Sequence, residues 1–254
     1  MNMALLAAVA SMLGVAPVLS PVGGLHAAEL KVLAGGSLTA VLNELGPAFE
    51  RASGHKLVIH FDSTPNLIQQ ATSGDPFDLG VVPADVFKDA AARARFMPGP
   101  TIDIAHVGYG VAVRAGAPKP DVVTPDAFRK TLIEAKSITF LPASAAGAHI
   151  LRVFERLGIG EAMKAKTIAQ TAPAQIPQAV ARGDAELGIF VVNVLTAPGV
   201  ELAGPFPAEL QQELVFAAGI AVDTREAAAA QAFLDYLGTP AAASVIKAKG
   251  LNPG

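Results

Sequence analysis

The chain has 254 residues, of which 52% are hydrophobic, and a formal net charge of −3 at pH 7. This length is enough to bury a sizeable core in one large domain or two small ones. Because only 16% of the residues are charged and no basic field stands out, we expect no nucleic-acid partner. The absence of cysteine excludes disulfides, thiolate metal sites and a cysteine nucleophile.

The N-terminal stretch, residues 1–28, contains no Asp, Glu, Lys or Arg. Its apolar run, residues 4–18, is shorter than a comfortable transmembrane helix, and small residues follow it up to Ala28. This arrangement predicts a secretory signal peptide that is cleaved near Ala28. A buried N-terminal helix is the alternative. No second long apolar segment follows, so we expect the exported protein to be soluble.

Apolar periodicity divides the rest of the chain into alternating strands and helices. In the first half, strands are expected at 30–34, 56–61, 78–82 and 106–114, and helices at 37–53, 63–74, 84–94 and 125–136. In the second half, strands are expected at 137–141, 185–192 and 214–222, and helices at 148–158, 173–184, 225–238 and 240–249.

This alternation implies an α/β fold with mostly parallel sheets flanked by helices. A strand–loop–helix unit occurs twice, near residues 32–42 and 138–150. In open α/β sheets, ligands bind beyond the carboxyl ends of the strands. Two such units predict two lobes that are joined by crossing strands and enclose a ligand cleft.

Three loops at the carboxyl ends of strands carry small or hydroxyl-bearing residues. They are Gly36 and Ser37 in "AGGSLTAVL", Ser63 and Thr64 in "FDSTPN", and the serine, alanines and glycine of "PASAAG". The free N–H groups of a first helical turn and their partial positive charge favour an anion. Each loop alone also fits a plain capped turn. The three together predict a cleft for a small anion.

Two titratable residues lie beside these loops. His149 follows the third loop on the first helical turn, where it can donate to a carboxylate or oxyanion if it faces the cleft; an ordinary core or surface histidine is the alternative. Asp62 fits a capped turn, or contact with a ligand hydroxyl or cation, better than contact with an anion. The sequence contains no metal-ligand spacing, nucleophile elbow, P-loop or dinucleotide fingerprint, so we expect no metal and no cofactor.

The residues of these loops belong to a longer stretch that resembles the ModA-type molybdate-binding proteins, the exported receptors of ABC importers. The resemblance begins with "LKVLAGGSLTAVLNELGPAFERASGHKLVIHFDSTPNLIQQATSGDPFDLGVVPAD" and continues through "AVRAGAPKPD", "LGIF" and "ELAGPFPAELQ". It implies the two-lobed type II periplasmic-binding fold with two crossover strands, and a periplasmic location. Lobe 1 would comprise residues 29–110 plus 218–254 and lobe 2 residues 111–217, with a hinge near 107–114 and 214–220.

The resemblance also implies roles for individual residues. The family's serines fall on Ser37 and Ser63, and its backbone donors fall on Ala146 and near Ile176. Its ligand tyrosine falls on Val191, so either Asn193 compensates or the ligand is not molybdate. With the loop residues, the full candidate set is Gly36, Ser37, Ser63, Thr64, Ala146, Gly147, His149, Ile176, Val191 and Asn193.

Two segments, "VAVRAGAPKPD" and "PGVELAGPFPAELQ", are more similar to a divergent branch of ModA-like proteins that includes an exported aconitate isomerase. Such an enzyme needs a base and an acid, for which His149, Asp62 and His60 are the candidates. This branch often carries a "QQ-S-E" stretch where the present sequence has "FVVN".

These observations predict a monomeric periplasmic solute-binding protein of an ABC-type importer. Its ligand would be a small anion, either an oxyanion such as molybdate or an organic carboxylate, and its partner an inner-membrane permease. The alternatives are an exported, cofactor-free isomerase of a small carboxylic acid, and an exported receptor that serves a sensor.

Overall fold

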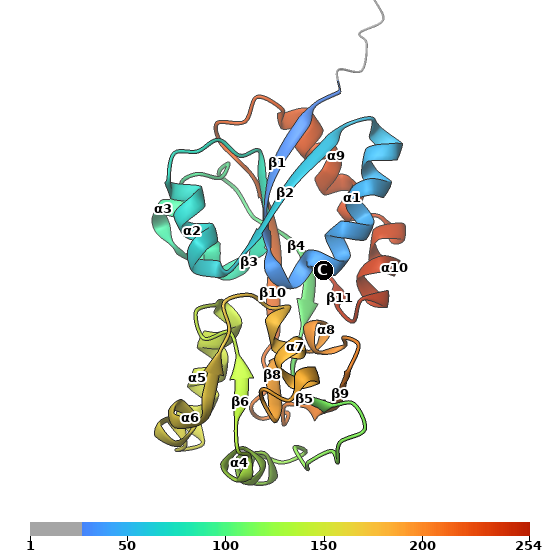
Figure 1. Ribbon diagram of the computed structural model, residues 1–254. Coiled ribbons are helices and arrows are strands. Elements are labelled where there is room, and N and C mark those ends of the chain that lie inside the picture. Colours follow the sequence, from blue (N-terminus) through green and yellow to red (C-terminus); the bar gives the residue numbers. More distant parts are fainter. Residues whose placement is uncertain (1–26) are drawn as a thin grey trace, which may run out of the picture.

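The computed structural model describes residues 27–254, which form an upper and a lower lobe as drawn in Figure 1. The predicted signal peptide lies outside the described residues, apart from Ala27 and Ala28. Within the described part of the chain, no helix is both long and apolar enough to cross a membrane. Each lobe is built on one β-sheet that is flanked by helices.

The upper lobe combines the first and last parts of the described chain. Its six-stranded sheet has the order β11-β4-β10-β3-β1-β2. The strands are β1 (Glu29–Gly35), β2 (Lys56–Asp62), β3 (Leu79–Pro83), β4 (Ile102–Val107), β10 (Leu214–Ile220) and β11 (Asn252–Pro253). The helices are η1 (Gly36–Leu38), α1 (Thr39–Ser53), α2 (Thr64–Thr72), η2 (Ala84–Lys88), α3 (Ala90–Arg93), α9 (Ala227–Leu237) and α10 (Pro240–Ala248).

The lower lobe is formed by the middle of the chain. Its five-stranded sheet has the order β7-β6-β8-β5-β9. The strands are β5 (Tyr109–Arg114), β6 (Ile138–Phe140), β7 (Thr167–Ala169), β8 (Leu187–Val191) and β9 (Val200–Pro205). The helices are α4 (Pro125–Glu134), α5 (Ala145–Arg156), α6 (Gly160–Lys166), α7 (Gln175–Arg182) and α8 (Val192–Leu195).

Both sheets have a parallel part that is extended by antiparallel strands. The parallel strands are β2, β1 and β3 in the upper lobe and β7, β6 and β8 in the lower lobe. All residues of β3 and β8 are buried, whereas exposure alternates along most of the edge strand β2. Strands that are covered on both faces need apolar residues at nearly every position. The loops predicted to bind an anion follow β1, β2 and β6, which all belong to the parallel parts of the two sheets.

The chain passes between the lobes twice, at Gly108 and in the segment 206–213, and Gln211 ties the two passages together. The Gln211 Oε1 atom accepts a hydrogen bond from the Tyr109 N–H (2.8 Å), and its Nε2 donates to the Tyr109 carbonyl (3.0 Å). A side chain at Gly108 would press against the Gln211 amide. One amide side chain thus fixes the geometry at which the chain leaves the upper lobe.

The expected α/β architecture and most of its elements agree with the structure, but the extended segment 106–114 does not form one strand. It is divided at Gly108 between β4 of the upper sheet and β5 of the lower sheet. Sequence periodicity continues across this point because both strands are apolar. The structure also contains short elements that apolar periodicity does not predict: β7, β9, β11, α6 and α8, with only 2 to 7 residues each.

Sheet membership gives a finer division into lobes than the sequence did. The upper sheet ends at Val107 and resumes at Leu214, whereas the lower sheet runs from Tyr109 to Pro205. We therefore propose residues 29–107 plus 214–254 for lobe 1 and 109–205 for lobe 2, in place of the expected boundaries at 110/111 and 217/218.

Candidate functional site

A small cavity lies where the three hydroxyl-bearing loops meet between the lobes. We call it the central cavity; its volume is about 20 Å³. It is lined by Gly35, Gly36, Ser37, Asp62, Ser63, Thr64, Pro83, Leu141, Ser144, Ala145, Ala146, Pro173, Phe190, Leu214 and Phe216. Both lobes contribute, and Asp62 is the one charged residue among these described lining residues, none of which is Lys or Arg. The cavity is therefore a partly apolar enclosure with a few polar groups and no positively charged side chain.

Ser37 and Ser63 hold their hydroxyl groups free at the starts of two helices. Ser63 occupies the N-cap position of α2, yet its side chain makes no capping hydrogen bond, and neither hydroxyl has a hydrogen-bond partner among the described residues. Most serines at such positions cap the helix. Ser37 is only 9% exposed. These hydroxyls remain for a ligand.

The third loop uses most of its donors internally and leaves one N–H group. Ser144 caps α5, because its hydroxyl accepts from the Gly147 N–H (2.9 Å) and donates to the Leu141 carbonyl (2.8 Å). The Gly147 position has no room for a Cβ atom, which would overlap the Leu141 carbonyl. Gly147 thus serves close packing, and it is Ala146 whose N–H has no partner in the described structure and lines the central cavity.

Two direct hydrogen bonds join the lobes around the central cavity. The Ala145 N–H donates to Thr64 Oγ1 (3.1 Å), and Asn193 Nδ2 donates to the Ser37 carbonyl (2.7 Å). A cavity of about 20 Å³ offers room for one water molecule. A tetrahedral oxyanion or a carboxylate is larger, so its binding requires the lobes to separate and Thr64 to release the Ala145 N–H.

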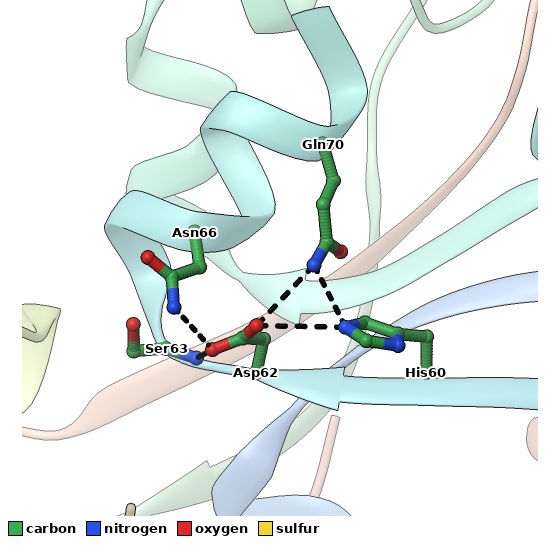
Figure 2. Close-up of polar contacts among 5 residues, drawn as sticks. All are labelled: His60, Asp62, Ser63, Asn66 and Gln70. Atoms are coloured by element: carbon green, nitrogen blue, oxygen red, sulfur yellow. Dashed lines mark hydrogen bonds and ion pairs between the residues drawn. The ribbon is translucent and has the colours of Figure 1, made fainter. Parts of the chain in front are cut away.

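The carboxylate of Asp62 is occupied by donors from its own loop and from α2 (Figure 2). Its Oδ1 accepts from the Ser63 N–H and from Asn66 Nδ2, both at 2.7 Å, and its Oδ2 accepts from Gln70 Nε2 at 3.2 Å. His60 lies on the same side, with Nε2 3.4 Å from Oδ2.

Burial alone would raise the pKa of Asp62, but hydrogen bonds from the Ser63 N–H, Asn66 and His60 outweigh it, so that the pKa lies below its ordinary value. The carboxylate is therefore ionised, and hydrogen-bond donors on one side of the loop stabilise its charge. Asp62 supports the loop that presents the Ser63 hydroxyl, and its charge does not stand alone in the central cavity.

His149 is buried and belongs to a different cavity from Asp62. Its Nε2 lies 3.1 Å from the Leu210 carbonyl, and its ring packs on Tyr109 with centroids 4.6 Å apart. Burial, which outweighs the hydrogen bond to Leu210, lowers the pKa of His149. A neutral imidazole that donates from Nε2 carries a lone pair on Nδ1. His149 is therefore placed to accept a hydrogen bond or a proton rather than to donate to a carboxylate.

The last three candidates, Ile176, Val191 and Asn193, do not line the central cavity. The Ile176 N–H donates to the Pro173 carbonyl (3.1 Å), and Ile176 does not line the central cavity. Val191 is fully buried in β8 and is likewise absent from the lining, where its neighbour Phe190 lies instead. Asn193 lines a wider groove of about 560 Å³ that opens from Gly36, Ser37 and Ser63 toward solvent. Its Oδ1 is buried without a partner in the described structure.

Sequence reasoning missed three residues that the structure brings to the site. Phe190 provides an apolar wall of the central cavity, and Tyr109 and Arg152 line an adjacent cavity together with His149. One signal was present: Arg152 lies three residues after His149 on a predicted helix, and such residues share a face. Tyr109 gave no signal because its strand was not separated from the preceding one.

Comparison with known proteins agrees with this architecture. Residues 30–252 match the family model described as "Bacterial extracellular solute-binding protein". The chain belongs to this solute-binding family. It is 32% identical to an aconitate isomerase from a Pseudomonas species, over 88% of this chain and 87% of that protein. It is 29% identical to the molybdate-binding protein ModA of Azotobacter vinelandii, over 89% of this chain and 90% of that protein.

Solved structures confirm the fold. The periplasmic molybdate-binding protein of Azotobacter vinelandii superposes with a TM-score of 0.73 at 23% identity, covering 87% of this chain and 98% of that one. The tungstate-binding protein TupA of Desulfovibrio alaskensis gives a TM-score of 0.65 at 14% identity, covering 90% and 99%. The predicted resemblance to ModA-like proteins and the predicted two-lobed periplasmic-binding fold are both confirmed.

Proposed function

We propose that this solute-binding protein holds a small anion, an oxyanion or an organic carboxylate, in the central cavity between its lobes. One observation carries the proposal: the hydroxyls of Ser37 and Ser63 and the N–H of Ala146 converge on this cavity without partners in the described structure. Both hydroxyls are open to the cavities that their residues line rather than sealed in the interior. Free donors from both lobes around one cavity are what a closing anion receptor requires.

Neutral donors suit a reversible receptor. Hydroxyl and N–H groups at helix starts stabilise an anion through directed hydrogen bonds and the helix dipole, without a fixed opposite charge. In this proposal the ligand replaces the Thr64–Ala145 contact and keeps the lobes together, and the chain bends at Gly108 and at segment 206–213. The ligand shifts the population toward the closed state because only that state presents donors from both lobes.

The proposal includes the protein's location and partners. We propose export to the periplasm, cleavage near Ala28, and delivery of the ligand, by a monomer, to an ABC permease in the inner membrane. Membership of an extracellular solute-binding family supports export, and the ModA relatives support an oxyanion or similar anion.

A thermal-shift panel with the purified chain tests the proposal. The panel contains molybdate, tungstate, sulfate, phosphate and mono-, di- and tricarboxylates. A ligand at 100 times its Kd adds about 2.7 kcal/mol of stability, which raises the Tm by roughly 5–10 °C in a domain of this size. Ser37→Ala should reduce the shift by about half or more, whereas the remote surface variant Ser244→Ala should retain it. If no anion stabilises the wild type, the proposal is wrong.

Isomerisation of a small carboxylic acid is the second candidate, and the 32% identity to an aconitate isomerase favours it. The expected pair of His149 and Asp62 gains no support, because these residues line separate cavities and Asp62 is already occupied by donors. His149 alone, with its lowered pKa, fits a general base.

An assay of cis- to trans-aconitate conversion, without added metal, tests the second candidate. The isomerase reading predicts turnover by the wild type and its loss in His149→Ala. An inactive wild type would reject the second candidate. Full activity in His149→Ala would reject His149 as the base.

A further inference from the structure

A second polar cavity adjoins the central cavity, and we call it the side cavity. Its volume is about 100 Å³. It is lined by Ala84, Asp85, Lys88, Tyr109, Ala145, His149, Arg152, Gln212, Glu213, Leu214 and Val215. Ala145 and Leu214 line both cavities. The two cavities therefore lie next to each other at the same interface, and both lobes contribute to each.

The charged residues of the side cavity leave one positive charge without an ion-pair partner. Lys88 and Asp85 pair with each other at 2.8 Å. Glu213 lies 3.4 Å from His106 and accepts a hydrogen bond from Asn252 Nδ2. Arg152 forms no ion pair within the described residues, although it lies close enough to His149 and Tyr109 to influence both. A guanidinium in this position is suited to a carboxylate, which it can bind through two parallel hydrogen bonds.

The side chain of Tyr109 supplies a second donor. It is 1% exposed and packs between His149 and Phe206, with ring centroids 4.6 and 5.6 Å away. Its hydroxyl has no hydrogen-bond partner among the described residues and is not sealed in the interior, so it is open to the side cavity that Tyr109 lines. Burial of the residue, with a smaller effect of Asp85, raises its pKa above the ordinary range. The phenol thus stays protonated and can donate to a ligand oxygen in this cavity.

We propose that the side cavity is a carboxylate subsite, in which Arg152 and Tyr109 bind the second acidic group of an organic di- or tricarboxylate. The first acidic group lies in the central cavity on Ser37, Ser63 and the Ala146 N–H. The inference rests on the proposed function and narrows its ligand class. It accounts for a cavity without cationic side chains beside one that contains Arg152: a single-centred oxyanion fills the first and leaves the second unused.

Calorimetric titration of the full chain with acetate, succinate, fumarate, citrate and molybdate tests the inference. We expect the wild type to bind at least one di- or tricarboxylate more tightly than acetate by about tenfold or more, as expected for a charge-assisted contact. Arg152→Gln should weaken that polycarboxylate by about tenfold or more and Tyr109→Phe by roughly fivefold. Arg156→Gln removes the same charge one turn further along α5, outside the cavity, and should change the affinity by less than about twofold.

The outcomes separate this inference from the proposed function. Binding of molybdate without any polycarboxylate overturns the subsite and leaves the proposed function intact. Polycarboxylate binding that Arg152→Gln leaves unchanged, or that Arg156→Gln weakens equally, also overturns the subsite. If Ser37→Ala weakens binding of every anion while Arg152→Gln affects polycarboxylates alone, both are supported. If no anion binds the wild type, both are wrong.

Discussion

The central and side cavities lie at one interface but differ in chemistry. The central cavity presents hydroxyls and N–H groups and has no Lys or Arg in its lining, whereas the side cavity contains Arg152, Lys88 and a buried tyrosine. The first can hold an anion of any shape that accepts several hydrogen bonds. The second selects for a planar, charged group. In our proposal, affinity for an anion and discrimination among anions therefore reside in different cavities.

The largest effect is expected from removing both hydroxyls of the central cavity. Ser37→Ala with Ser63→Ala deletes two hydrogen bonds to a charged ligand, each worth about 1.5–3 kcal/mol. Affinity for every bound anion should fall by about 100-fold or more, as measured by calorimetry.

The matched control for the double variant is Ser244→Ala, whose hydroxyl donates to Pro240 within α10. It should bind as the wild type does. If the control loses as much affinity as the double variant, or if the double variant keeps its affinity, the central cavity is not the anion site.

The Gln211→Ala variant disturbs the wall of the side cavity. It removes the two hydrogen bonds that hold the backbone of Tyr109. Because the Tyr109 N–H is left without a partner, while its carbonyl keeps the hydrogen bond from the Phe206 N–H, the free energy of unfolding should fall by about 2 kcal/mol. Chemical denaturation measures this loss. The surface variant Gln231→Ala serves as control, and equal stability of the two variants would show that the tie between the passages is unimportant.

A smaller effect is expected from Asp62→Asn, which tests whether this carboxylate supports the Ser63 loop. The amide cannot accept from all of Ser63, Asn66 and Gln70, so stability should fall by about 1 kcal/mol at neutral pH. Because the folded pKa of Asp62 is depressed, the wild type's advantage should disappear as the pH falls below about 3.9. A large gain in anion affinity in this variant would mean instead that the carboxylate repels the ligand.

The smallest effect concerns His149 and acid stability. Burial lowers the folded pKa of His149, whereas the unfolded value is about 6.5. The unfolded chain therefore binds the proton first, and stability is lost as the pH falls below about 6.5. His149→Gln should flatten this part of the pH profile, as followed by thermal unfolding between pH 7 and pH 5. An unchanged slope would show that His149 is not held neutral.

The sequence predicted which loops meet between the lobes better than it predicted the other residues that line the two cavities. Ser37 and Ser63 were predicted because strand ends and helix starts are visible in periodicity and composition, whereas Ala146 was carried over from the family pattern. Ile176 and Val191 were carried over from a family pattern, and the structure places neither of them in the central cavity lining, because the register of β8 presents Phe190 there. Tyr109 and Arg152 were missed because they meet only when segments far apart in the chain fold against each other.

A crystal structure with the most stabilising anion of the panel tests the central claim most directly. The account predicts the anion between the lobes, with its oxygens within hydrogen-bond distance of Ser37 Oγ, Ser63 Oγ and the Ala146 N–H, and with Thr64 released from Ala145. Two results would contradict the account. In one, the anion is bound elsewhere on the protein. In the other, the lobes are closed as they are now and the central cavity is still too small to admit the anion.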